Sequence, residues 1–328
     1  MKQISFSKHH TDILKIYFIL TVTVFHIWRY VYKMPILPGY GVVGFFIISG
    51  YGCYISLQNK PFKTFLKSRL YYITPPYYIA LLFYSIAHFF FGFYNTHVPL
   101  HRDILGLITH ILFIHNISGY TQWTISGVLW FIAVIVQLYF LSDYLKKMVD
   151  LRIKTALSLI AIIFIAEFLV QHFFRIENLY FFKGWHLIYL SPYLLGMCLA
   201  KYREFLLAWI NQKLQNKLLL AVYFLITAFL TYFTLYSKDI ATMTFIVVFS
   251  LPLLLLACNI VAGIIPEKTI NFLGTFSFFL YLYNYTFYIF QSGSKSPEIQ
   301  IISAFAAIFI TAYCFYLVNK KVNLKRED

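Results

Sequence analysis

The chain has 328 residues, of which 60% are hydrophobic and only 12% are charged. A soluble domain carries about twice that share of charge, and a soluble core of this size cannot bury so much apolar surface. A water-soluble globular fold is therefore excluded, and a lipid bilayer is the expected solvent. In a soluble protein, the formal net charge of +15 would indicate an acidic partner such as nucleic acid. Here the positions of the Lys and Arg residues along the chain, described below, explain the charge without such a partner.

Ten apolar stretches long enough to cross a bilayer follow one another along the chain. One such helix needs about 20 mostly apolar residues. The expected spans are 12–31, 40–58, 70–92, 127–145, 155–173, 184–200, 217–236, 240–263, 269–290 and 299–318. The expected fold is all-α, a polytopic membrane helix bundle that forms a single domain over residues 1–328, with no appended soluble domain.

The stretch 103–118 is apolar but shorter, and it carries His110 and His115. It is expected to lie at the membrane interface as an amphipathic or re-entrant piece. It belongs to the one long loop, residues 93–126, where aromatic and polar side chains suit a carbohydrate acceptor; plain interfacial anchoring is the alternative. Its histidines have no zinc-site spacing, so no metal is expected.

Lys and Arg residues alternate with these spans in a consistent way. If the N-terminus lies in the cytoplasm, 19 of the 27 Lys and Arg residues fall in cytoplasmic segments, which are 1–11, 59–69, 146–154, 201–217, 264–268 and 319–328. Cytoplasmic loops are enriched in these residues. The sequence therefore predicts about ten transmembrane helices with both the N- and C-termini in the cytoplasm.

The cysteines provide no evidence for a disulfide framework. The four of them lie far apart, each in or beside an apolar run, and no Cys-x-x-Cys occurs. They are expected to act as small buried hydrophobic residues; they are Cys53, Cys198, Cys258 and Cys314.

Two ionisable residues in the first span, Lys15 and His26, are costly inside a bilayer and so indicate function. They are 11 residues apart, three helical turns plus about 20°, so they share one face about 16 Å apart along the axis. A neutral imidazole can take a proton from a hydroxyl as it attacks a thioester, and a cation can hold phosphates. The alternative is a lysine that reaches the head groups and a histidine satisfied in the core.

Three further features lie in the second and third spans or next to them. Residues 39–52 are rich in glycine, which permits close helix packing or a broken helix along a cavity. Arg69 is a second candidate for phosphate binding, with an ordinary cytoplasmic anchor as the alternative. Pro75 and Pro76 follow it and predict a kink that opens space for a ligand.

Five segments together resemble acyltransferase family 3, a family of polytopic membrane acyltransferases. The first is Lys15-x10-His26, which is similar to the basic-x10-His motif of the family's first helix. The others are VVGFFIISGYG (42–52), FLKSRLYYITPPYY (65–78), LWFIAVIVQLYFL (129–141) and LGTFSFFLYLYNY (273–285). They occur in the family's order and span nearly the whole chain. Tyr72, Ile135, Val136 and Asn284 depart from the family pattern.

The resemblance implies an enzyme that takes an acyl group, usually acetyl, from a cytoplasmic coenzyme A thioester. The acceptor would be a hydroxyl of a lipid-linked or cell-surface glycan, and the protein would lie in the inner membrane of a bacterium. His26 is the expected general base, and Lys15 and Arg69 the expected residues for the acetyl-CoA phosphates. Candidate substrate-binding residues are Trp130, Ser277, Tyr281 and Asn284; the last three share a helix face, and hydrogen bonding between helices is their alternative role.

A glycan or lipid exporter without enzymatic activity is the alternative function, because many spans, short loops and buried polar residues fit it too. A transporter of this kind is expected to show paired broken helices in two halves, and the sequence shows no such symmetry. Neither a nucleotide-binding glycine motif nor a Gly-x-Ser-x-Gly element occurs.

Overall fold

The structure is a computed structural model, and it describes residues 6–32, 39–91, 100–118, 120–173, 186–213, 216–234, 240–289 and 296–324. Within these residues the fold is all-helical. The helices are α1 (Lys8–Tyr32), α2 (Gly39–Asn59), α3 (Phe62–Phe91), α4 (Leu100–Ile111), η1 (His115–Ile117), α5 (Trp130–Leu151), α6 (Ile153–Phe173), α8 (His186–Lys201), α9 (Arg203–Lys213), α10 (Lys217–Thr234), α11 (Ile240–Ile264), α12 (Glu267–Leu282), η2 (Thr286–Tyr288) and α13 (Pro297–Leu324). Each of the ten predicted spans corresponds to an α-helix.

Four described helices are long and apolar enough to cross a membrane by length and composition alone. Their membrane-length segments are Lys8–Tyr32, Tyr40–Asn59, Ala241–Ile264 and Pro297–Lys321. The helical character of the chain is therefore confirmed, and four described helices have the length and composition of membrane spans, while the count of ten spans and the position of both termini stay predictions.

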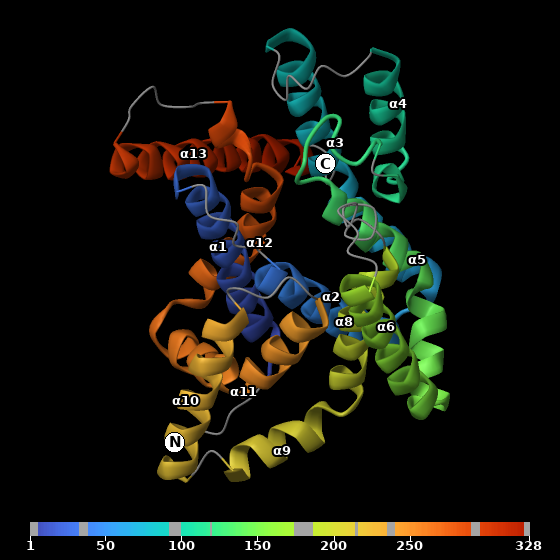
Figure 1. The fold of residues 1–328 in the computed structure, drawn as a ribbon, viewed down its shortest axis with the longest axis vertical. Coiled ribbons are helices and arrows are strands. Elements are labelled where there is room, and N and C mark those ends of the chain that lie inside the picture. The colour runs from blue at the N-terminus through green and yellow to red at the C-terminus, as the bar shows by residue number, and fades with distance from the viewer. Residues whose placement is uncertain are drawn as a thin grey trace.

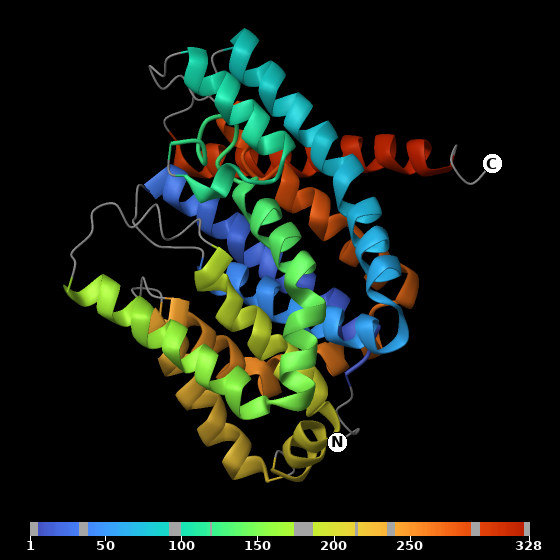
Figure 2. The same ribbon diagram turned by 90° about the vertical axis from the view of Figure 1, so that its right-hand side faces the viewer.

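Helix α1 lies at the centre of the bundle, in contact with α2, α11, α12 and α13 (Figure 1). Helix α3 runs along one flank, and α5 lies between it and α6 (Figure 2). The apolar core is continuous across these helices and includes Phe18, Phe46, Tyr77 and Ile132, all fully buried. The arrangement places Asp12 and Thr23 of α1 inside the protein, against α12 and the turn that follows it.

Helices α2 and α8 pack so closely that each needs a glycine. A Cβ at Gly50 would lie 1.9 Å from the carbonyl oxygen of Tyr193, and a Cβ at Gly196 would lie 2.0 Å from that of Ile47. The obstacles are backbone atoms, which cannot rotate away. This contact confirms the packing role predicted for the glycine-rich segment.

Helix α4 has the inside-out pattern of a helix in contact with lipid. Its apolar residues Ile104, Leu105 and Ile108 are exposed, whereas Asp103 and His110 are buried. The amphipathic character predicted for 103–118 is therefore present, in the form of α4 and the short helix η1.

The cysteines follow the expectation with one exception. Cys53, Cys198 and Cys258 are buried as predicted, but Cys314 is exposed on α13. The reason is its position on the outward face of a helix that covers the bundle.

Candidate active site

Polar residues on one face of α1 contact α12 and the turn that follows it. Thr23 accepts a hydrogen bond of 2.8 Å from Nδ2 of Asn284, and both side chains are fully buried. Nearer the N-terminus, Asp12 packs directly on Gly274, where an added Cβ would lie 2.6 Å from the Cβ of Asp12. An α-helix has 3.6 residues per turn, so Asp12, Thr23 and His26 lie close to one face of α1, the face that contacts α12 and the turn after it.

His26 is half-buried, and its ring meets the ring of Tyr285 edge-on, with centroids 4.8 Å apart at 85°. The next turn of the same helix carries Arg29, whose charge acts on the imidazole. Within the described part of the chain, neither ring nitrogen forms a hydrogen bond with the protein. The imidazole is thus fixed in orientation by packing, while its nitrogens stay available to a substrate.

Lys15 lies beside an acidic partner that the sequence pattern does not reveal. Its Nζ atom is 2.7 Å from Oδ1 of Asp12, whose side chain is only 5% exposed, whereas the lysine side chain is 40% exposed. A buried carboxylate requires a counter-charge, and Lys15 provides it. Lys15 and His26 are 11 residues apart on α1, so they share one face of this helix about 16 Å apart along its axis.

Arg69 is enclosed by α2, α3 and α5. Its Nη2 atom donates to the carbonyl oxygen of Gly52 at 3.3 Å, and its guanidinium lies 5.5 Å from the ring centroid of Phe65 and 5.8 Å from that of Tyr139. Tyr72 interacts electrostatically with both Arg69 and Asp12. Tyr72 is thus close to Arg69 and to Asp12, the partner of Lys15.

The remaining candidate residues have separate partners. Trp130 packs on Tyr189, with ring centroids 5.1 Å apart. Ser277 donates to Gly274 of its own helix at 2.7 Å, and Tyr281 donates to the carbonyl oxygen of Val128. Asn284 is bonded to Thr23 of α1, so Tyr281 and Asn284 connect neighbouring segments, whereas Ser277 bonds within α12. Their role in substrate binding stays a prediction.

Pro75 and Pro76 lie inside α3, which continues through both of them. Neither has an N–H to donate, so the carbonyl oxygens of Tyr71 and Tyr72, four residues earlier, lose their usual donors within the helix. Beside them is a hollow of about 280 Å³ between α3, α12 and α13, which Tyr72 and Thr275 help to line. A hollow therefore lies beside the two prolines, but Arg69 does not line it, and a kink that opens space next to Arg69 stays a prediction.

The profile of an acyltransferase domain matches residues 9–320 of this chain, which is nearly its whole length. The chain belongs to acyltransferase family 3. Membership indicates an integral membrane acyltransferase and confirms the resemblance found in the sequence. No match is found among curated proteins or among solved structures.

In this acyltransferase the described part of the long loop packs over the end of the bundle near His26. His110 and His115 stack with ring centroids 3.7 Å apart at 6°, and both are fully buried. Tyr84 connects this region to the site: it donates to the carbonyl oxygen of Leu282 at 3.0 Å and lies within hydrogen-bonding range of Ser126. Binding of an acceptor by this loop stays a prediction.

The stacked histidines predict a dependence of stability on acid. Burial lowers the pKa of His110 to about 4 and that of His115 well below its ordinary value. As the pH falls below about 6.5, the unfolded chain takes up these protons before the folded one does. The free energy of unfolding should therefore decrease between pH 6.5 and about 4, by roughly 3 kcal/mol for a shift of this size, and stay constant above this range.

Unfolding of the detergent-solubilised protein at pH 7 and pH 4.5 measures this effect. The double variant His110→Gln/His115→Gln should show a smaller difference in midpoint temperature between the two pH values than the wild type. An equal difference in both proteins would show that other groups govern the acid response.

Proposed function

We propose that the protein is an O-acyltransferase that moves an acetyl group from acetyl-CoA to a hydroxyl of a cell-surface or lipid-linked polysaccharide. Family membership supports the acyltransferase class. The main structural support is His26, an imidazole that is oriented by Tyr285 within the bundle and whose nitrogens form no hydrogen bond in the described part of the protein. A neutral imidazole nitrogen that the protein leaves unbonded can accept the proton of a substrate hydroxyl.

The transfer needs one base and no metal ion. His26 accepts the proton of the acceptor hydroxyl while the hydroxyl oxygen attacks the carbonyl carbon of the thioester. The new C–O bond forms as the C–S bond breaks, and the proton moves on to the departing thiolate, which leaves as the free thiol. His26 is neutral at the start and at the end. The ring of Tyr285 keeps the imidazole in place during both proton transfers.

The donor enters from the cytoplasmic side in this proposal. Lys15 and Arg69 supply positive charge at the inner end of the site, where Tyr72 interacts with Arg69 and with Asp12, the partner of Lys15. The acceptor approaches from the extracytoplasmic side, next to the 93–126 loop. Its candidate contacts remain Trp130, Ser277, Tyr281 and Asn284. This arrangement requires the ten-span topology with both termini in the cytoplasm, in the inner membrane of a bacterium. In this proposal the protein binds acyl-CoA and the carbohydrate acceptor as substrates, and it is embedded in the lipid bilayer.

Mass spectrometry of surface glycans tests the proposal. Glycans from cells that express the protein should contain species heavier by one acetyl unit than glycans from cells that lack it, and mild alkali should remove the difference because an ester is labile to base. Identical glycan masses, with the protein present in the membrane, would contradict the proposal and favour the exporter.

A further inference from the structure

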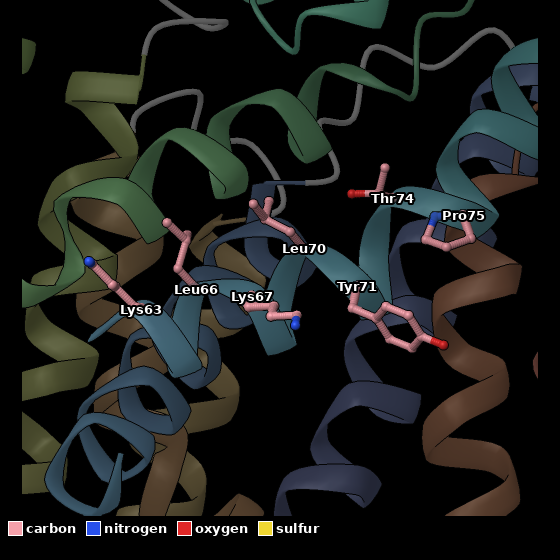
Figure 3. Close-up of a pocket in the computed structure, with 7 residues that line it drawn as sticks. All are labelled: Lys63, Leu66, Lys67, Leu70, Tyr71, Thr74 and Pro75. Carbon is pink, nitrogen blue, oxygen red and sulfur yellow. The ribbon is translucent and has the colours of Figure 1, made fainter. Parts of the chain in front are cut away.

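An open groove follows the first half of α3 along one side of the helix. It has a volume of about 570 Å³, and the residues that line it recur every three to four positions from Lys63 to Pro75. This spacing is that of a single helix face, so the groove runs parallel to the helix axis. Figure 3 shows Lys63 at one end of the row of lining residues and Pro75 at the other.

The lining of this groove combines two polarities. Lys63 and Lys67 border the part nearest the start of α3, and both are exposed. The rest of the lining is mostly apolar and includes Leu66, Leu70 and Pro75. An exposed apolar surface of this kind marks a binding site for a ligand or a lipid, and the lysines beside it indicate that the ligand is amphiphilic.

The positive charge of these two lysines is uncompensated. Within the described residues neither ammonium group forms a hydrogen bond or an ion pair, and residues 59–75 include no Asp or Glu. By contrast, Lys146 and Lys147 on α5 pair with Asp150 and Asp143. The two groove lysines are one helical turn apart, and their flexible stems let both reach one anionic group. The charge at this end of the groove therefore favours an anionic head group.

The position and length of the groove fit one leaflet of a bilayer. Its lysines lie in the segment expected at the cytoplasmic surface, 59–69, whereas Leu70 and Pro75 lie inside the expected span 70–92. Lys63 and Pro75 are about 18 Å apart along the helix axis, and one leaflet contributes about 15 Å to the hydrocarbon core. A lipid of this leaflet can therefore place its head group at the lysines and an acyl chain along the rest of the groove.

We propose that this groove binds one anionic phospholipid of the cytoplasmic leaflet. Lys63 and Lys67 donate hydrogen bonds to the phosphate of its head group, and one acyl chain lies against Leu66 and Leu70 and extends towards Pro75. A negative head group joined to a hydrocarbon chain is the chemistry that both parts of the groove require. The lipid takes no part in acyl transfer, so this assignment does not depend on the proposed function. It depends on the predicted orientation of α3.

Native mass spectrometry of the full-length protein in detergent tests the assignment, with phosphatidylglycerol and phosphatidylcholine of identical acyl chains as probes. The wild type should bind the first phosphatidylglycerol molecule more tightly than phosphatidylcholine. The double variant Lys63→Gln/Lys67→Gln should raise the Kd for phosphatidylglycerol about ten-fold, because two basic side chains next to an anionic head group are lost. The control Lys60→Gln/Lys154→Gln removes the same charge from positions that do not line the groove, and it should leave the Kd within about two-fold of the wild type.

The variant Thr74→Trp tests the part of the groove that holds the acyl chain. Thr74 lines the groove beside Tyr71 and Pro75, so an indole at this position would occupy the space of the chain without changing the charge. The Kd for phosphatidylglycerol should rise beyond the two-fold limit of the control. A melting temperature equal to that of the wild type would show that the variant is folded.

Three other outcomes would each overturn the assignment. Equal losses of affinity in the double lysine variant and the control would reduce the groove lysines to general surface charge. An unchanged Kd in folded Thr74→Trp would show that no acyl chain lies in the groove. A double variant that binds phosphatidylglycerol normally but coenzyme A more weakly would assign the lysines to a soluble phosphorylated ligand. The proposed acyl transfer would stand in each case, because its test measures acetyl groups on glycans.

Discussion

Replacement of His26 by alanine should lower kcat for acyl transfer by about 10²- to 10⁴-fold, the range typical for loss of a general base. The physical reason is that its imidazole, held edge-on to the Tyr285 ring, has nitrogens that the described part of the protein leaves unbonded. His26→Gln should be impaired to a similar degree, because an amide fills the space but cannot take up a proton at neutral pH. Release of free thiol from acetyl-CoA by the purified protein, in the presence of acceptor, measures both variants.

The matched control is His9→Ala on the same helix. His9 pairs with Glu267 at 3.3 Å near the start of α1, about 25 Å from His26 along the helix axis, and its loss should change kcat less than two-fold. Comparable membrane levels and elution profiles for all variants would exclude a folding defect. A His26→Gln enzyme with wild-type kcat would contradict the role of His26 as the base.

Gly50→Ala should strongly destabilise the protein, because its added methyl group would meet backbone atoms of the neighbouring helix. The new Cβ would lie 1.9 Å from the carbonyl oxygen of Tyr193 and 2.8 Å from its carbon, so α2 and α8 would have to separate. Overpacking against side chains lowers the free energy of unfolding by about 1–3 kcal/mol. Because the obstacle here is rigid backbone, the loss for Gly50→Ala should be at or above the upper end of this range. Separation would also disturb the Ser142–Tyr193 hydrogen bond of 2.7 Å that joins α8 to α5.

Heating the detergent-solubilised protein and recording the loss of the monodisperse peak measures this prediction. Gly263→Ala is the matched control, because nothing lies within 4 Å of a Cβ at Gly263 and alanine favours a helix over glycine by about 1 kcal/mol. The control should melt at or above the wild-type temperature. An unchanged melting temperature for Gly50→Ala would show that the two helices are not in backbone contact.

Helix positions could be predicted from the sequence because apolar length is a strong signal in a membrane protein. The predicted span 240–263, for example, differs from α11 (Ile240–Ile264) by one residue. Two helices could not be predicted in this way. Helix α9 carries several charged residues and falls in a segment expected to be cytoplasmic, and α4 is only 12 residues long.

The site was predictable only where a residue conflicted with its surroundings. Lys15 and His26 stand out as ionisable groups within an apolar run, and their spacing gives their common face. Asp12 gives no such signal, because it lies at the predicted edge of the first span, where an acidic residue is ordinary. Tyr285 is hidden for a different reason: one tyrosine among 28 carries no signal until the turn after α12 brings it against α1.

The sequence is even less informative about which lysine side chains could bind a ligand. A positive charge in a cytoplasmic segment is expected whether or not it binds a ligand, so the sequence could not separate Lys63 and Lys67 from Lys60. The distinction arises only from three-dimensional contacts, namely which ammonium groups the protein has already neutralised and which border an open space.

The fate of a labelled acetyl group is the decisive measurement for transfer with His26 as the base. The purified protein would be reconstituted into vesicles with acetyl-labelled acetyl-CoA on the side of the N-terminus and glycan acceptor on the other side. Label should accumulate in the glycan with the wild type, and at no more than about one hundredth of that rate with His26→Ala. Label that reaches the glycan equally fast with both proteins, or with neither, would contradict catalysis by His26.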